Sequence, residues 1–191
     1  MTPENYRKKQ AKTIRQFRKI HRKLAIILFV FFFLVSISGI LLGWKKHSGG
    51  LILPGQHIGT STNLKDWLPI NDLNKMATQI LHDSVSGELS AELDRIDIRQ
   101  ELGLVKFVYQ NHYWGIQLDG ATGKLLSLEK RRSDFIENIH DGTIFDKLFE
   151  THNTYIKLIY SSLMGLALLT LTISGFWLWF GPKRMRRKKT E

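Results

Sequence analysis

The stretch LAIILFVFFFLVSISGILLGW, from Leu24 to Trp44, decides the fold because its twenty-one residues carry no charge. At ~1.5 Å of rise per residue, a helix over this stretch is roughly 31 Å long, which matches the hydrocarbon core of a bilayer. A cleaved signal peptide would have an apolar region of about 7 to 15 residues followed by small residues. Here the run is longer and ends in Trp44, Lys45 and Lys46. We therefore predict an uncleaved transmembrane helix over residues 24–44.

A second charge-poor run, Leu158 to Phe180, predicts another transmembrane helix over residues 155–180. Nine Lys or Arg precede the first span, within residues 1–23, and six more lie in the tail at residues 181–191. The loop between the spans, residues 45–154, holds twelve basic and fifteen acidic residues and has a net charge of −3. Because short cytoplasmic segments are enriched in Lys and Arg, we predict that both termini are cytoplasmic and that the loop is external.

The basic tails of this chain, whose net charge is +11, predict contact with anionic lipid headgroups, each charge contributing about 1 kcal/mol. Nucleic acid is the other usual partner of basic tails, but two adjacent membrane spans explain them without it. We expect residues 1–12 to be disordered. Gly39 and Gly43 form a GxxxG pattern, which favours close helix contact and a homodimer. The absence of cysteine excludes disulfides and Cys-based metal or redox chemistry.

The loop between the spans predicts a small α+β domain. Residues 45–70 contain glycines and prolines with little periodicity, which is typical of an extended connector. We expect Asn71 to cap a helix whose apolar face is formed by Leu73, Met76, Ala77, Ile80 and Leu81. The period then changes to two, which predicts four antiparallel strands, the third with Trp114, Ile116 and Leu118 facing the helix. We place this domain at residues 71–135 and an interfacial segment at 136–154.

Several segments resemble the PepSY-associated transmembrane family of bacterial membrane proteins. WGIQLDGATGKLLSL, at residues 114–128, resembles the hallmark PepSY segment, in which an aspartate and a TGK-type turn separate two strands. The connector at residues 53–73 resembles the connector of the family. Three segments that bound the two spans also resemble the corresponding segments of the family: HRKLAI at 21–26, IHDGTIF at 139–145 and ISGFWLWFGPK at 173–183. The resemblance implies a two-span protein of the bacterial cytoplasmic (inner) membrane with a PepSY-like periplasmic domain.

PepSY modules resemble the propeptide of thermolysin-type metallopeptidases. The resemblance therefore implies that the external domain binds or regulates a partner, either an envelope protease or a transport or assembly protein. Larger relatives with more spans are associated with haem and with the reduction of ferric siderophores. Carried over to this chain, that alternative implies a haem b electron-transfer component of iron uptake.

The histidines limit where such a haem could bind. His21 and His47 lie at opposite ends of the first span, about 39 Å apart in a continuous helix, so they cannot share an iron. His140 and His152 bracket a short segment near the outer boundary and are our candidate haem ligands. They can serve one iron if the chain turns between them or if two copies supply one ligand each. We therefore expect no haem in the isolated monomer.

No catalytic motif is present in the sequence: HExxH, a Gly-rich phosphate loop and GxSxG are all missing. We accordingly predict no enzymatic activity and no metal site. Two hypotheses from different classes remain open. One is a membrane-anchored binding module, and the other is a haem-binding electron-transfer component.

Overall fold

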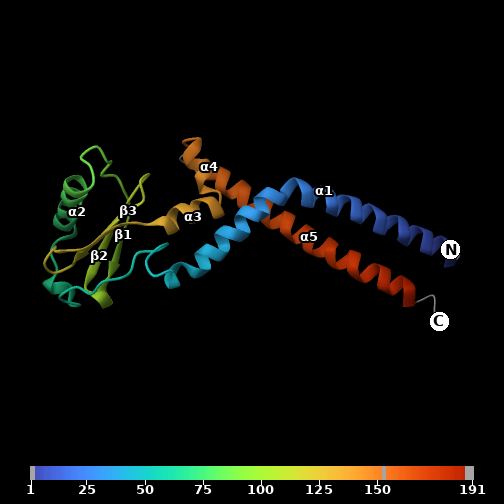
Figure 1. The fold of residues 1–191 in the computed structure, drawn as a ribbon, viewed down its shortest axis with the longest axis horizontal. Coiled ribbons are helices and arrows are strands. Elements are labelled where there is room, and N and C mark those ends of the chain that lie inside the picture. The colour runs from blue at the N-terminus through green and yellow to red at the C-terminus, as the bar shows by residue number, and fades with distance from the viewer. Residues whose placement is uncertain (1–2, 152–153, 188–191) are drawn as a thin grey trace. The chain divides into compact units, whose positions relative to one another are not determined.

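The computed structural model describes residues 3–151 and 154–187. The chain forms two compact units: a helical unit, from residues 1–39 and 138–191, and an α+β unit, residues 40–137. The helices are α1 (Pro3–Trp44), α2 (Ile70–Ser84), α3 (Arg132–His140), α4 (Thr143–Leu148) and α5 (Tyr155–Arg187). The strands are β1 (Leu93–Arg99), β2 (Leu104–Tyr109), β3 (Trp114–Asp119) and β4 (Leu125–Lys130). Short 3-10 turns lie at η1 (Lys45–His47), η2 (Leu64–Asp66) and η3 (Gln100–Leu102). Figure 1 shows these elements.

Two helices are long and apolar enough to cross a membrane. One candidate span lies within Lys8–His47, with a mean hydropathy of 2.9 in its most apolar part, and the other within Tyr155–Arg184, with 1.8. Their apolar side chains are mostly exposed on the chain, as expected where lipid is the solvent. α1 continues as one helix back to Pro3, so the expectation of a disordered tail is wrong for residues 3–12.

Within the helical unit, α1 and α5 run antiparallel, and the N-terminal end of α1 lies near the C-terminal end of α5 (Figure 1). Contacts near the two ends of the helix pair support this arrangement. A Cβ added at Gly181 would lie 3.2 Å from the Ile14 side chain. Farther along, the rings of Phe31 and Tyr160 are 6.4 Å apart.

The N-terminus of α5 is held by Asp146 of α4. Its carboxylate accepts hydrogen bonds from the backbone N–H groups of Ile156 (3.3 Å) and Lys157 (2.8 Å), and from the hydroxyl of Thr151 (2.6 Å). These hydrogen bonds lower the pKa of Asp146, and the bond from Thr151 has the largest effect. A carboxylate at this position satisfies N–H groups that the helix itself leaves unpaired. Asp146 therefore caps the start of α5, the helix that contains the second candidate span.

The α+β unit is an antiparallel meander with strand order β1-β2-β3-β4 and α2 on one face. Its core consists of Leu73, Ala77 and Leu81 of α2, Val105, Phe107 and Tyr109 of β2, and Ile116 and Leu118 of β3. The predicted orientation of Ile116 and Leu118 toward the helix is confirmed, and Trp114 packs, partly buried, against the same core. Two details of the predicted helix are wrong. Met76 is 40% exposed, and the N-cap position falls on Pro69, so Asn71 lies inside α2.

The connector before α2 is bonded to the sheet along much of its length. The Gln117 side chain donates to the carbonyl of Gly55 (2.7 Å), and the Gly59 N–H donates to that of Leu102 (2.7 Å). Gln117 follows Ile116 along β3, so its side chain points to the face opposite α2. The connector therefore covers that face, and the structural unit extends beyond residues 71–135.

Candidate functional site

His140, the last residue of α3, lies against the first long helix. Its Nδ1 is 3.0 Å from the Oγ of Ser38, and its Cε1 is 3.3 Å from the position that a Cβ on Gly39 would occupy. Ser38 is buried. A larger residue at position 39 would displace the ring, so Ser38 and Gly39 together form a seat for the imidazole.

His21 makes the same contact with the second long helix. Its Nδ1 is 2.8 Å from the Oγ of Ser174, which is buried, and its Cε1 is 3.6 Å from the Cβ position of Gly175. Each seat is part of an Ile-Ser-Gly tripeptide, which occurs at residues 37–39 and again at residues 173–175. The seventeen-residue step from His21 to Ser38 spans roughly 26 Å of helix. The helical unit therefore holds one histidine near each end of its spans.

Each serine can set the tautomer of its imidazole. The Ser38 hydroxyl is 2.7 Å from the backbone carbonyl oxygen four residues earlier, and that of Ser174 is 3.2 Å from the carbonyl oxygen three residues earlier. When the single hydroxyl proton of a serine is donated to this carbonyl, its oxygen accepts from the Nδ1–H of the histidine, and Nε2 carries the lone pair. No hydrogen bond joins Nε2 of either ring to another of the described residues.

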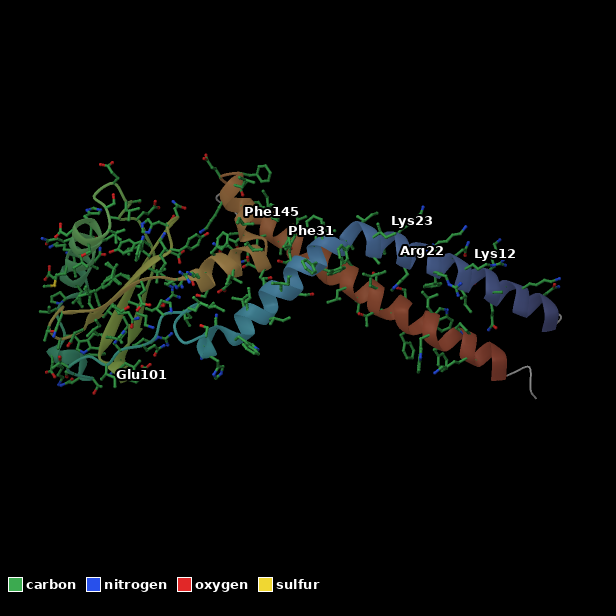
Figure 2. All side chains as sticks on the ribbon, in the orientation of Figure 1. Lys12, Arg22, Lys23, Phe31, Glu101 and Phe145 are labelled. Atoms are coloured by element: carbon green, nitrogen blue, oxygen red, sulfur yellow. The ribbon has the colours of Figure 1, made fainter. Side chains whose placement is uncertain are left out.

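An aromatic cluster surrounds the turn that follows His140. The ring of Tyr160 lies 5.6 Å from that of Phe145 and 6.4 Å from that of Phe31. Figure 2 shows Phe31 and Phe145 close together near the junction of α1, α4 and α5. Gly142 has φ +83°, and a Cβ there would lie 2.4 Å from the Tyr160 ring. The turn thus needs glycine for two reasons, its backbone conformation and the close ring.

Of the two predicted haem ligands, His140 occupies the seat on α1, whereas His152 lies outside the described residues. Among the residues that are described, no three His, Cys, Asp or Glu side chains gather as a metal site. Of the two glycines in the GxxxG pattern, Gly39 is covered by the His140 ring, whereas Gly43 has no described atom within 4 Å of its Cβ position.

Each of the two imidazoles has a serine hydroxyl within hydrogen-bonding distance of one ring nitrogen. Histidines that ligate metals generally donate their other ring N–H to a fixed acceptor, which sets the tautomer and orients the ring. The contacts of His21 with Ser174 and of His140 with Ser38 are compatible with that arrangement. From the sequence, Ser38 and Ser174 have no base nearby, and this expectation is wrong, because the Nδ1 atoms of His140 and His21 lie 3.0 and 2.8 Å from their hydroxyl oxygens. The repeated Ile-Ser-Gly tripeptide could have indicated these contacts, but the sequence does not show which histidine lies against each copy.

Asp119, the aspartate of the segment 114–128, has a structural role. One carboxylate oxygen accepts from the N–H groups of Ala121 (2.9 Å) and Thr122 (3.3 Å), and the other accepts from the N–H (2.9 Å) and the hydroxyl of Thr60. Burial raises the pKa of Asp119, but these hydrogen bonds outweigh it and leave the pKa below the usual range. The ionised side chain therefore joins the β3–β4 turn to the connector.

The fold and the two histidine seats define a class: an α+β membrane protein in which two transmembrane helices flank a small antiparallel sheet with its own helix. The sequence profile described as "PepSY-associated TM region" matches residues 18–191. The chain belongs to the PepSY-associated transmembrane family. Comparison with curated proteins gave no match, and comparison with solved structures gave none either.

Proposed function

We propose that the helical unit is an electron-transfer element that holds haem b at His21 and His140. The observation that carries this proposal is the pair of imidazoles, each with Nδ1 within hydrogen-bonding distance of a buried serine hydroxyl and Nε2 without a hydrogen-bond partner among the described residues. Haem would supply a one-electron ferric–ferrous couple. The part of this chain is to hold each imidazole in one tautomer and orientation.

A second copy of the chain completes each site in this proposal. Among the described residues, each end of the helical unit offers one seated histidine, so a second chain would supply the other ligand of an iron with two histidine ligands. The isolated monomer should accordingly contain no haem. Of the two glycines that favour a homodimer, Gly43 has the open surface that close approach of another helix requires.

We further propose that the protein lies in the inner membrane of a bacterium with both termini cytoplasmic and the α+β unit periplasmic. Basic residues of the N-terminal half of α1, among them Lys12, Arg22 and Lys23 (Figure 2), and the six basic residues at positions 183–189 support this orientation. In this orientation His21 lies at the cytoplasmic end and His140 at the periplasmic end. The chain would then connect a cytoplasmic electron donor with an external acceptor, such as a ferric chelate in iron uptake.

Haem content tests the proposal directly. Membranes that contain only this protein should show a Soret band, and the purified dimer should bind two haems. His21→Ala and His140→Ala should each remove about half of the haem, and the double variant nearly all of it. His57→Ala, an exposed position on the connector, is the matched control and should have wild-type haem content. A dimer without a Soret band after supply of haem, or a band unchanged in both variants, would refute the proposal.

The second candidate function is binding of an envelope protein, a protease or a transport or assembly protein, by the α+β unit. It is favoured by a sheet in which β1 and β4 each pair with only one neighbour, so both edges have unpaired backbone groups of the kind that extended segments can join. A photocrosslinker at Ile98, an exposed position on β1, should then join the chain to such a protein in native membranes. The same crosslinker at Asp83 of α2 should not. Adducts at neither position would count against this candidate.

A further inference from the structure

A cavity of about 350 Å³ lies in the α+β unit, between the β2–β3 turn, the end of β4 and the start of α3. It is lined by His112, Tyr113, Lys130, Arg132, Phe135 and Ile136, and we call it the hairpin–helix pocket. Its volume is at the lower end of the range for small-molecule sites, about 300 to 1,000 Å³. All six residues belong to the same unit and none of them contributes to the histidine seats.

The backbone at this pocket is strained. Asn111 has φ +67° and Tyr113 has φ +58°. Asparagine tolerates the left-handed region, but a bulky residue such as tyrosine rarely adopts it. Such a conformation costs on the order of 1–3 kcal/mol and persists where the surroundings enforce it, often at ligand sites. Here the Tyr113 carbonyl accepts a hydrogen bond from the Arg131 N–H (2.8 Å). This hydrogen bond helps to hold the backbone of Tyr113 in that conformation, and Tyr113 lines the pocket.

The wall is aromatic. The rings of Tyr113 and Phe135 meet edge to face, with centroids 5.8 Å apart and planes at 75°. Phe135 is 44% exposed, and Ile136 extends the apolar surface next to it. Aromatic side chains prefer edge-to-face or offset contacts with other rings. This pair therefore favours a flat aromatic body over a flexible polar one.

The rim is cationic. Lys130 and Arg132 line the pocket together with His112, and no acidic side chain from the described part of the chain does. Arg132 is exposed, and it donates a long hydrogen bond, 3.4 Å, to the carbonyl of Leu51. A guanidinium has five N–H donors in a planar fork that suits a carboxylate, so most of the donors remain for a ligand.

We propose that the hairpin–helix pocket binds a small aromatic carboxylate, with the ring against Tyr113 and Phe135 and the carboxylate at Arg132. The cationic rim favours the carboxylate, and the Tyr113–Phe135 ring pair favours the aromatic body. The site lies outside the haem-binding proposal, because its residues belong to the α+β unit.

The probe for this proposal is 2-naphthoate, with the uncharged 2-naphthamide as its matched compound. Full-length protein in phosphatidylcholine nanodiscs should bind the carboxylate about tenfold more tightly than the amide in a calorimetric titration, as expected for hydrogen bonds to a charged group. Arg132→Gln should remove this preference and leave amide binding unchanged. Lys124→Gln, at an exposed position on the β3–β4 turn, is the charge-matched control and should bind as the wild type does.

Two aromatic variants test the wall. Phe135→Ala should weaken both compounds about tenfold. Tyr113→Gly should do the same while the backbone keeps its conformation, because glycine adopts positive φ without strain. Equal affinity for carboxylate and amide, no saturable binding, or a wild-type preference in Arg132→Gln would each overturn the proposal. The haem content of Arg132→Gln should equal that of the wild type, so a failure here is distinguishable from failure of the haem proposal.

Discussion

Replacing Asp119 with asparagine should destabilise the α+β unit by about 2–3 kcal/mol. The two carboxylate oxygens accept four hydrogen bonds, two from the turn (Ala121 and Thr122) and two from Thr60 of the connector. An amide has only one acceptor oxygen, so one of these donor pairs must face an NH₂ group whichever way the side chain turns. Hydrogen bonds to charged acceptors contribute about 1.5–3 kcal/mol each, and losses within one network are not additive.

Hydrogen exchange on the full-length protein in nanodiscs measures this loss where it occurs. Amides around Thr60 and in the β3–β4 turn should exchange about 30- to 150-fold faster in Asp119→Asn if they exchange through opening of the unit. Asp83→Asn is the matched control, because Asp83 is exposed on α2, and it should change the stability by less than about 0.5 kcal/mol. If the two variants exchange alike, the hydrogen bonds of Asp119 do not stabilise the unit.

The same carboxylate predicts a pH dependence. The pKa of Asp119 is lower in the folded protein than in the unfolded chain. Its contribution is therefore fully present above the unfolded value, about 3.9, and is lost as the pH falls through the lower folded value. Wild type and Asp119→Asn should converge in stability below about pH 4, as measured by urea unfolding. A difference that stays constant from pH 7 to pH 3 would contradict this assignment.

Three further predictions concern other parts of the chain. Ile116→Asp should unfold the α+β unit, because an unpaired charge in a core position that is 0% exposed costs several kcal/mol; unchanged protease resistance would contradict the core assignment. Ser38→Ala should weaken haem binding about 10- to 100-fold, whereas Ser36→Ala, at an exposed position, should not. Equal haem affinity in the two variants would show that Ser38 does not support haem binding. Reporters placed after Glu191 and near Gly87 should give cytoplasmic and external signals respectively, and the reverse pattern would refute the proposed orientation.

Local patterns in the sequence carried most of the architecture. The charge-free run that ends at Trp44 is long enough to cross a bilayer whatever surrounds it, because the hydrocarbon core excludes charge over its full thickness. Alternation in β2 and β3 placed Phe107 and Ile116 on one face, since successive side chains of a strand point to opposite sides. The same reasoning failed at Met76, which has the right helical spacing but lies at the margin of the sheet that α2 covers. The spacing of apolar residues predicts which face of a helix is buried, whereas the extent of the packed sheet decides how much of that face is covered.

The sequence alone determined two spans, a small α+β domain and the family, because length, charge and periodicity are properties of neighbouring residues. Only the tertiary structure decided which distant side chains meet. Ser38 and His140 are 102 residues apart, and His21 and Ser174 are 153 apart. Neither pair has a local signature, since a serine beside a glycine is common in membrane helices. The antiparallel packing of α1 and α5 brings His21 to Ser174, and the end of α3 brings His140 to Ser38 of α1. The proposed function rests on these two contacts.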